Sequence, residues 1–406
     1  MVSSIGHPVS RRAGNTRNAP HADIDNRQEE RRHDDGLSKE LVRMRKKNPQ
    51  GIQRKNLQRI LVRVPNWIGD AVMCTPALIA LREIFPLAHI SVLARPTIAE
   101  LLQHHPAIDH IVTYDHQHRH AGIFGKFALI RELRSLQTDM AVLFQNAFEA
   151  ALLTWFANIP IRYGYATDGR RPWLSHPIPL PRWTAQRHHT EYFSEMLRPV
   201  TSDFQHHSPS LVITEQEKEW AENKLQTQTM LWIGINPGSV YGGAKRWLPE
   251  RFAEAADHII KYLQSVLEEE KDIGALIVGK AGEEALGQTI AQHMQAKTMV
   301  LSGHTTIREL MAIIKQCHGF LTNDTGPMHM ADALGVPVVA IFGPTNPDTT
   351  APYGNRHAVV RQPVRCTPCL LRWCPIDHRC MTEVSVEEVV KTAMQQMQHV
   401  LESRRI

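Results

Sequence analysis

Short apolar segments typical of buried strands alternate with helical segments along the chain, and this alternation constrains the fold more than any other feature. It runs twice. The expected strands are 60–64, 89–94, 110–114, 140–144, 232–236, 275–279, 319–323 and 337–342. The expected helices are 71–85, 98–104, 124–134, 252–263, 307–315, 328–334 and 386–401. Strands separated by helices form βαβ units around a parallel sheet. We therefore expect an α/β protein with two doubly wound, Rossmann-like halves.

The segment 161–210 interrupts the alternation. It is rich in proline, arginine and histidine, and it falls where a loop-rich linker between two halves would lie. Ligands of doubly wound sheets bind outside the carboxyl ends of the strands, so a cleft between the halves is the expected site. The resulting division is an arm over 1–55, one domain over 56–208, a second over 209–385 and a last helix within 386–406.

Charge is concentrated at the start of the chain. The 406 residues carry a net charge of +5, and the first 55 hold 13 of the 46 Lys and Arg residues but 7 of the 41 Asp and Glu residues. That segment lacks hydrophobic periodicity, which predicts a disordered basic arm. Met44 is also a plausible start, which would make the preceding residues a gene-model artefact. The remaining chain is nearly neutral, which argues against nucleic-acid binding by the fold itself.

Targeting signals also bear on location. No stretch reaches the roughly 18–20 apolar residues that span a bilayer, and the N-terminus lacks the apolar core of a secretory signal. We therefore expect a cytoplasmic protein whose six cysteines are reduced.

The first loop of interest follows the strand 60–64 and has the sequence PNWIGD. Gly69 permits a tight turn into the next helix, and Asp70 stands at the expected start of that helix. One interpretation is a simple helix N-cap, which stabilises by about 1 kcal/mol. The other is a carboxylate that faces the cleft and takes a proton from a hydroxyl group. These residues alone favour the cap.

The second loop, PGSVYGGAKRW over 237–247, follows the strand 232–236. Its glycines let backbone N–H groups approach a ligand, and Lys245 and Arg246 add positive charge. Backbone donors with a cation suit a phosphate. The alternative is a glycine-rich surface loop with solvated bases, and the spacing matches neither a Walker motif nor GxGxxG.

The third loop, NDTGPMH over 323–329, follows the strand 319–323. Pro327 suits the first turn of a helix, and Gly335 suits its end. The start of such a helix offers free N–H groups and partial positive charge to an anion, with His329 in the first turn. Capping by Asp324 or Thr325 is the alternative.

Four cysteines lie close together near the C-terminus, at Cys366, Cys369, Cys374 and Cys380, with His378 among them. Thiols at such spacing predict a structural zinc site. Iron–sulfur ligation and a loop of reduced thiols are the alternatives. Cys74 and Cys317 fall in helical segments, and we expect them to be buried thiols.

Taken together and in this order, the segments 60–77, 237–247 and 323–334 resemble the ADP-heptose:lipopolysaccharide heptosyltransferases. The segment CTPCLLRWCPIDHRCM over 366–381 resembles one found in many heptosyltransferase II-type members. The resemblance covers roughly residues 58–400. It implies the GT-B fold, with two Rossmann-like halves that face each other across a cleft and a last helix that packs back across both. The first half would then be the acceptor domain and the second the ADP-sugar-binding domain.

The resemblance also assigns roles to residues. It implies that Asp70 is the general base of an inverting transfer of L-glycero-D-manno-heptose from ADP-heptose to the lipopolysaccharide inner core, built on Kdo-lipid A. The diphosphate would be held by Ser239, Lys245, Asp324, Thr325, Gly326 and His329, and the adenosine by Glu283 or Glu284. Protein donors would stabilise the leaving diphosphate, so no catalytic metal is expected.

The acceptor and the membrane are expected to meet the first half. We assign acceptor binding to Arg162, Arg170 and Arg171, and peripheral contact with the cytoplasmic face of the inner membrane to the arm and to the loops over 161–189. Two other functions remain open at this point. One is an ADP-heptose-dependent transferase with another acceptor, either a different core position or a protein. The other is a Rossmann-type oxidoreductase, which would need a GxGxxG after the first strand.

Overall fold

A computed structural model describes residues 57–404, except for residues 199, 202–204 and 268–271. Residues 57–406 form one compact unit. The arm expected over 1–55 lies outside the described residues. The division of the remaining chain into domains stays a prediction in its boundaries, although its two sheets follow the two series of strands.

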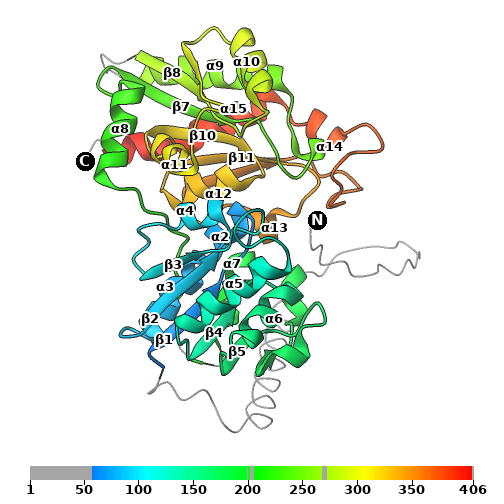
Figure 1. The fold of residues 1–406 in the computed structure, drawn as a ribbon. Helices are drawn as coiled ribbons and strands as arrows, with labels where there is room; N and C mark the ends of the chain where they lie inside the picture. The colour runs from blue at the N-terminus through cyan, green and yellow to red at the C-terminus, as the bar shows by residue number, and fades with distance from the viewer. Residues whose placement is uncertain (1–56, 199, 202–204, 268–271, 405–406) are drawn as a thin grey trace, which may run out of the picture. The chain divides into compact units, whose positions relative to one another are not determined.

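The first series of strands forms a six-stranded parallel sheet in the order β3-β2-β1-β4-β5-β6, in the lower half of Figure 1. Its strands are β1 (Arg59–Arg63), β2 (His89–Ala94), β3 (His110–Thr113), β4 (Met140–Leu143), β5 (Ile161–Tyr165) and β6 (His176–Ile178). The central strand β1 is buried from Ile60 to Arg63, because helices cover both faces of a parallel sheet.

The second series forms another six-stranded parallel sheet, in the order β12-β11-β10-β7-β8-β9. Its strands are β7 (Met230–Asn236), β8 (Asp272–Ile277), β9 (Thr298–Val300), β10 (Cys317–Asn323), β11 (Val338–Phe342) and β12 (His357–Arg361). The central strand β7 is buried along its whole length. Two parallel, doubly wound sheets confirm the expected α/β class.

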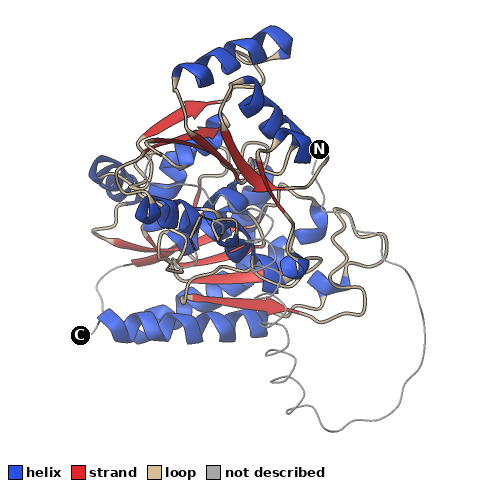
Figure 2. Ribbon diagram, turned by 90° about the horizontal axis from the view of Figure 1, so that it is seen from below, coloured by secondary structure: helices blue, strands red, loops and turns tan. Residues whose placement is uncertain are grey.

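Helices lie on both sides of each sheet, as Figure 2 shows. In the first half they are α2 (Ile68–Met73), α3 (Thr75–Ile84), α4 (Pro96–Leu101), α5 (Gly122–Ser135), α6 (Phe148–Phe156), η2 (Arg171–Trp173), η3 (Arg182–Ala185) and α7 (His189–Glu195). In the second half they are α8 (Glu215–Leu225), η4 (Gly243–Lys245), α9 (Pro249–Val266), α10 (Glu284–His293), α11 (Ile307–Lys315), α12 (Gly326–Ala333), α13 (Pro347–Thr350), α14 (Arg379–Thr382) and α15 (Val386–Arg404). Among the described helices, none combines the length and the apolar character that a membrane span requires.

The helix expected over 71–85 is two helices. The α2 helix starts earlier, at Ile68, and ends at Met73, and α3 begins at Thr75. Pro76 stands in the first turn of α3. A proline inside a continuous helix would remove one hydrogen bond and clash with the carbonyl four residues earlier, so the chain restarts its helix at this point.

The linker expected over 161–210 belongs largely to the first half. It contains β5 and β6, which complete the first sheet, and it contains α7. Because of the prolines, the sequence pattern did not predict these strands and this helix. Pro177 is tolerated in β6 because β6 is an edge strand, where a missing N–H leaves no neighbour unpaired.

The last helix does not cross the molecule as expected. α15 packs against α9, β11 and β12, which all belong to the second half. Its buried residues Val389, Val390, Ala393 and Met397 join the core beside β7 and β10. These contacts therefore differ from the predicted packing of the last helix back across both halves.

The two halves meet through helices that start at the carboxyl ends of central strands. α2 follows β1 and packs against α12, which follows β10. α4 also packs against α11. The carboxyl ends of parallel strands carry the ligand sites of such sheets, so the contact between α2 and α12 locates the candidate site.

Candidate functional site

Asp70 lies in the first turn of α2 and is not its N-cap. Trp67 occupies the cap position, and its side chain makes no capping hydrogen bond. The Asp70 side chain is 34% exposed, and its Oδ1 lies 3.7 Å from Nδ1 of His189. The capping interpretation is therefore wrong, and Asp70 presents a partly solvated carboxylate at the carboxyl edge of the first sheet.

His189 is a site residue that the sequence pattern did not reveal. It begins α7, inside the segment expected to be a linker. The preceding residue, His188, fixes the start of that helix: its Nδ1 accepts from the Thr190 amide and its Nε2 donates to the Ala351 carbonyl at 2.7 Å. Burial lowers the pKa of His188 to about 4, so His188 is a neutral structural residue.

His329 occupies the contact between α2 and α12. A Cβ atom on Gly69 would lie 2.9 Å from its ring, and one on Gly326 would lie 3.0 Å from Ile68. Burial lowers the pKa of His329 to about 4, despite the opposing influence of the carboxylates of Asp324 and Asp70. His329 is therefore a neutral imidazole placed between the two loops that carry those carboxylates.

Replacing Gly69 with alanine is expected to destabilise the protein by about 1–3 kcal/mol, because the added methyl group overlaps a buried ring that cannot swing away. Thermal unfolding measures this change. Removing the ring as well, in Gly69→Ala with His329→Ala, should cost less than the sum of the two single changes, because the overlap is gone. Strictly additive losses would contradict the contact.

Two loops at the carboxyl edge of the second sheet, after β7 and β11, converge on Asp324, which follows β10. Lys245 Nζ lies 2.5 Å from Asp324 Oδ2, and the hydroxyl of Thr345 donates to the same oxygen at 2.5 Å. Asp324 is buried, and the Lys245 side chain is nearly so. The expected grouping of Lys245 with Asp324 is present, and the Asp324 carboxylate holds the lysine in place.

The start of α12 has the form expected of an anion site. Thr325 is the N-cap, its side chain makes no capping hydrogen bond, and Gly326 and Pro327 open the helix. Asn323 fixes the strand end before it, since its side chain accepts from the Trp247 amide and donates to the Pro237 carbonyl. The first N–H groups of α12 therefore stand beside the Lys245 loop, and the Thr325 side chain accepts no capping hydrogen bond from them.

Glu283 and Ser239 line the other side of this cradle. Glu283 is buried, accepts from the Lys280 amide, and lies 3.3 Å from the Arg246 guanidinium. A Cβ on Gly238 would overlap its carboxylate, at 2.1 Å. The buried hydroxyl of Ser239 has no hydrogen-bond partner in the described structure, so it remains able to bond a ligand.

Glu284 is placed less favourably than Glu283. Its carboxylate lies against Gly303, where a Cβ would approach within 2.1 Å of Oε1. Hydrogen bonds from backbone amides at the start of α10 lower the pKa of Glu284. Of the two adenosine candidates, Glu283 is the one that contacts the phosphate cradle.

The cysteine-containing segment packs on the Lys245 loop. Ala244 N donates to the Arg372 carbonyl at 3.0 Å, His378 Nε2 donates to the Ala244 carbonyl at 2.8 Å, and the Tyr241 hydroxyl donates to the Leu370 carbonyl at 2.5 Å. The loop glycines permit this contact. A Cβ on Gly242 would lie 2.3 Å from the Arg372 carbonyl oxygen.

The structural zinc predicted from the spacing of the four cysteines stays a prediction. Among the described residues, no three His, Cys, Asp or Glu side chains stand where they could hold a metal ion. Cys380 is buried on α14, whereas Cys366 and Cys374 are exposed, and the His378 ring is engaged by Ala244. Burial, with the nearby thiols, raises the pKa of Cys380 to about 11. The segment supports the Lys245 loop by hydrogen bonds.

Two of the three arginines assigned to the acceptor are placed elsewhere. Arg170 is fully buried, and its guanidinium donates to the carbonyls of Tyr165 and Gln145 and to the side chain of Asn146. Arg162 starts β5, at the sheet edge opposite Asp70, and donates to the Trp173 carbonyl. Arg170 is therefore a structural residue, and Arg162 lies away from Asp70. Arg171 is exposed, and its acceptor role stays a prediction.

Residues 126–379 match the model of glycosyltransferase family 9 (heptosyltransferase). Lipopolysaccharide heptosyltransferase 2 of Salmonella typhimurium is 30% identical over 321 residues, which cover 75% of this chain and 88% of that protein. Lipopolysaccharide heptosyltransferase 2 of Escherichia coli is also 30% identical, over 311 residues, with the same coverage of both chains.

The fold agrees with these relatives. The structure of E. coli ADP-heptose lps heptosyltransferase II matches with a TM-score of 0.70 at 25% identity, over 84% of this chain and 99% of that one. A family 9 glycosyltransferase from Veillonella parvula matches with a TM-score of 0.74 at 24% identity, over 86% of this chain and 100% of that one. These matches confirm the expected GT-B architecture. With its two facing sheets, its carboxylate on α2 and its anion cradle at α12, the chain is a glycosyltransferase that belongs to glycosyltransferase family 9, the heptosyltransferases.

Proposed function

We propose that the protein transfers L-glycero-D-manno-heptose from ADP-heptose to the inner core of lipopolysaccharide, with inversion at the anomeric carbon. Relatives named lipopolysaccharide heptosyltransferase 2, at 30% identity over most of both chains, support this choice of acceptor. The printed name of the E. coli structure, an ADP-heptose lps heptosyltransferase II, supports the choice of donor.

The observation that carries the proposal is the position of His329. This buried ring packs on Gly69, the neighbour of Asp70, and lies within electrostatic range of Asp70, Asp324 and Lys245. One side chain thus connects a carboxylate of the first half with the anion cradle of the second. An acceptor hydroxyl beside Asp70 and a diphosphate beside Lys245 would leave the anomeric carbon between them.

The donor half supplies charge stabilisation. As the bond between the sugar and the diphosphate breaks, negative charge develops on the leaving oxygens, and preorganised donors at that point lower the barrier more than other contributions do. The start of α12, Lys245 and the unpartnered hydroxyl of Ser239 are such donors. Asp324 and Thr345 hold the lysine ready. No metal ion is needed for this role.

The acceptor half supplies the base. Asp70 takes the proton of the attacking hydroxyl as the new glycosidic bond forms, which contributes about 10²–10⁴-fold in rate. His189, 3.7 Å from the carboxylate, is a positioning residue that restricts the rotation of Asp70. Since the acceptor is a lipid, the reaction takes place at the cytoplasmic face of the inner membrane, with peripheral contact by the protein.

The transfer assay tests this proposal. The purified full chain is incubated with ADP-heptose and with inner-core acceptors built on Kdo-lipid A that carry no heptose or one heptose, and the products are identified by mass spectrometry. The expected product is the acceptor that already carries one heptose, extended by a second. Extension only of a protein or of another core position would favour the alternative acceptor, and no release of ADP with any acceptor would contradict the proposal.

A further inference from the structure

A row of exposed apolar side chains lies on α5 and α6, apart from the site described above. Phe124 is 86% exposed, and the other members are also exposed. We call the row the apolar face, and it consists of Ile123, Phe124, Phe127, Phe148, Trp155 and Phe156. Single exposed apolar side chains are ordinary, but a contiguous group of them marks an interaction surface.

The apolar face is supported by the packing of α5 against α6 and by ring contacts with Trp173. α5 packs against α6, and the ring of Trp173 lies 4.8 Å from that of Trp155 and 6.2 Å from that of Phe148. Phe156 lies 4.8 Å from Trp155. These edge-on ring contacts fix the α6 part of the face, and the α5 part lies beside it.

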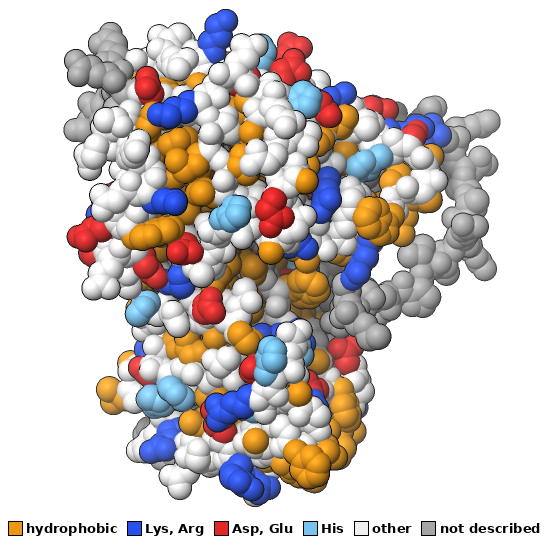
Figure 3. Space-filling view, turned by 45° about the horizontal axis from the view of Figure 1, so that its top comes forward, with side chains coloured by type: hydrophobic (Ala, Val, Ile, Leu, Met, Phe, Trp, Pro, Cys, Tyr) orange, Lys and Arg blue, Asp and Glu red, His pale blue; other side chains and the backbone are white. Residues whose placement is uncertain are grey.

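Positive charge surrounds the apolar face. Arg131 and Arg134 on α5 are exposed, and Arg162 lies at the far end of α6. The acidic neighbours are already neutralised, since Glu132 pairs with Arg119 and Glu149 pairs with Lys126. Figure 3 shows hydrophobic and basic side chains side by side in the lower part of the view. The surface therefore combines exposed rings with an excess of cations.

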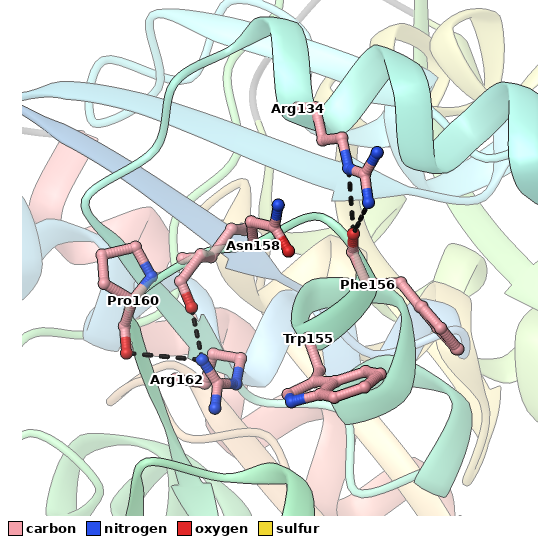
Figure 4. A pocket seen from close by; sticks show the side chains of 7 residues that line it. Arg134, Trp155, Phe156, Asn158, Pro160 and Arg162 are labelled. Carbon is pink, nitrogen blue, oxygen red and sulfur yellow. Dashed lines mark hydrogen bonds between the residues drawn. The ribbon is translucent and has the colours of Figure 1, made fainter.

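Two of these arginines border a cavity of about 480 Å³ at the end of α6. Figure 4 shows Arg134 and Arg162 apart from each other, with Asn158 between them and the rings of Trp155 and Phe156 to one side. Arg134 is fixed by two hydrogen bonds to the Phe156 carbonyl, and Arg162 by one to the Ile159 carbonyl. Two guanidinium groups held about an open cavity suit a phosphate-bearing headgroup.

The apolar face reaches the catalytic edge of the first sheet. α5 follows β3 and α6 follows β4, so the starts of both helices lie at the same edge as Asp70, where the carboxyl ends of parallel strands meet. α6 has 9 residues, which makes it about 13 Å long. A flat surface laid on both helices would thus extend from the level of the cavity to the level of the base.

We propose that the apolar face docks on a bilayer containing anionic phospholipid, with the rings at headgroup depth and a lipid phosphate in the Arg134–Arg162 cavity. Aromatic side chains with adjacent cations are the composition of membrane-interface surfaces, and the excess of arginine complements anionic lipid. The inference rests on the proposed lipid-linked acceptor. It moves the expected membrane contact from the loops over 161–189, in which Arg170 is buried, to the apolar face.

Vesicle sedimentation of the full chain, without donor or acceptor, tests the docking. The wild type should bind phosphatidylglycerol–phosphatidylethanolamine vesicles, bind phosphatidylcholine vesicles weakly, and lose affinity as salt is added. Ile123→Ser with Phe124→Ser should reduce binding at least tenfold while leaving thermal unfolding and ADP affinity unchanged. Arg131→Gln should reduce binding to the anionic vesicles about fivefold.

Leu87→Ser is the matched control, because Leu87 is 98% exposed and follows α3, which packs on α7. It should bind vesicles like the wild type. Undiminished binding by the Ile123→Ser, Phe124→Ser variant would overturn the proposal, as would a wild type that ignores anionic vesicles. So would a wild-type oligomer that this variant converts to monomer, since the face would then join two copies. Transfer to a detergent-dispersed acceptor is scored separately, so failure of docking and failure of the proposed function are distinguishable.

Discussion

Asp70→Asn is expected to lower turnover by about 10²–10⁴-fold, the usual contribution of a positioned general base. The amide has nearly the same shape but cannot accept the proton of the acceptor hydroxyl. Affinity for ADP should survive, because the cradle that holds the diphosphate lies on the second half, at Lys245 and the start of α12. Turnover and ADP affinity are measured on the same preparation, by ADP release and by calorimetry.

Stability should change little in that variant. Asp70 makes no capping hydrogen bond, and the loss of a partly exposed negative charge from a first helical turn costs about 0.3–1 kcal/mol. Glu83→Gln is the control for the carboxylate-to-amide change, since Glu83 lies on α3 and pairs with His207. Its turnover should match the wild type. Turnover within a few-fold of the wild type in Asp70→Asn would show that Asp70 is not the base.

Lys245→Ala is expected to weaken ADP binding by about 1.5–3 kcal/mol, roughly tenfold to a hundredfold, which is the range for a hydrogen bond to a charged group. Adenosine, which lacks the phosphates, should lose little affinity. Calorimetric titration with both ligands separates the two cases. Equal losses for ADP and adenosine would contradict a lysine that contacts phosphate.

The same change should also lower stability, which has to be separated from the effect on binding. Lys245 and Asp324 form a nearly buried pair, and removal of one partner leaves the other charge uncompensated, at a cost of about 3–5 kcal/mol. Lys245→Met with Asp324→Asn removes both charges and should recover most of that stability. ADP binding should remain weak in the double variant. Recovery of ADP affinity together with stability would instead assign the lysine a purely structural role.

The sequence predicted the central strands of both sheets and missed the edges. Central strands such as β1 and β7 are continuous apolar runs, because both of their faces are buried. The edge strand β6 has 3 residues and contains Pro177, so its pattern is that of a loop. Pro76, two residues after the break at Cys74, indicates that a new helix starts there. The apolar residues on both sides of the break nevertheless favoured the prediction of one continuous helix.

The arrangement of the candidate site was also predictable only in part. Asp70, Lys245 and His329 lie in or just after loops that follow central strands, because topology alone brings the ends of parallel strands to one edge. The sequence pattern did not predict contacts between segments that lie far apart in the chain. Nothing in the spacing shows that Arg170 would be buried under the carbonyls of Tyr165 and Gln145, or that the cysteine segment would pack on Ala244. Except for the bond to Tyr165, these pairings depend on three-dimensional packing between residues 25 or more positions apart.

The anomeric configuration of the product tests the central claim most directly. Asp70 as a base and a diphosphate leaving toward Lys245 define a single displacement, in which the acceptor oxygen attacks from the side opposite the leaving group. The heptose that the wild-type enzyme transfers from ADP-heptose should therefore carry the inverted configuration at C1, as read from the one-bond carbon–proton coupling of the isolated product by NMR. A product that retains the donor's configuration would contradict this account.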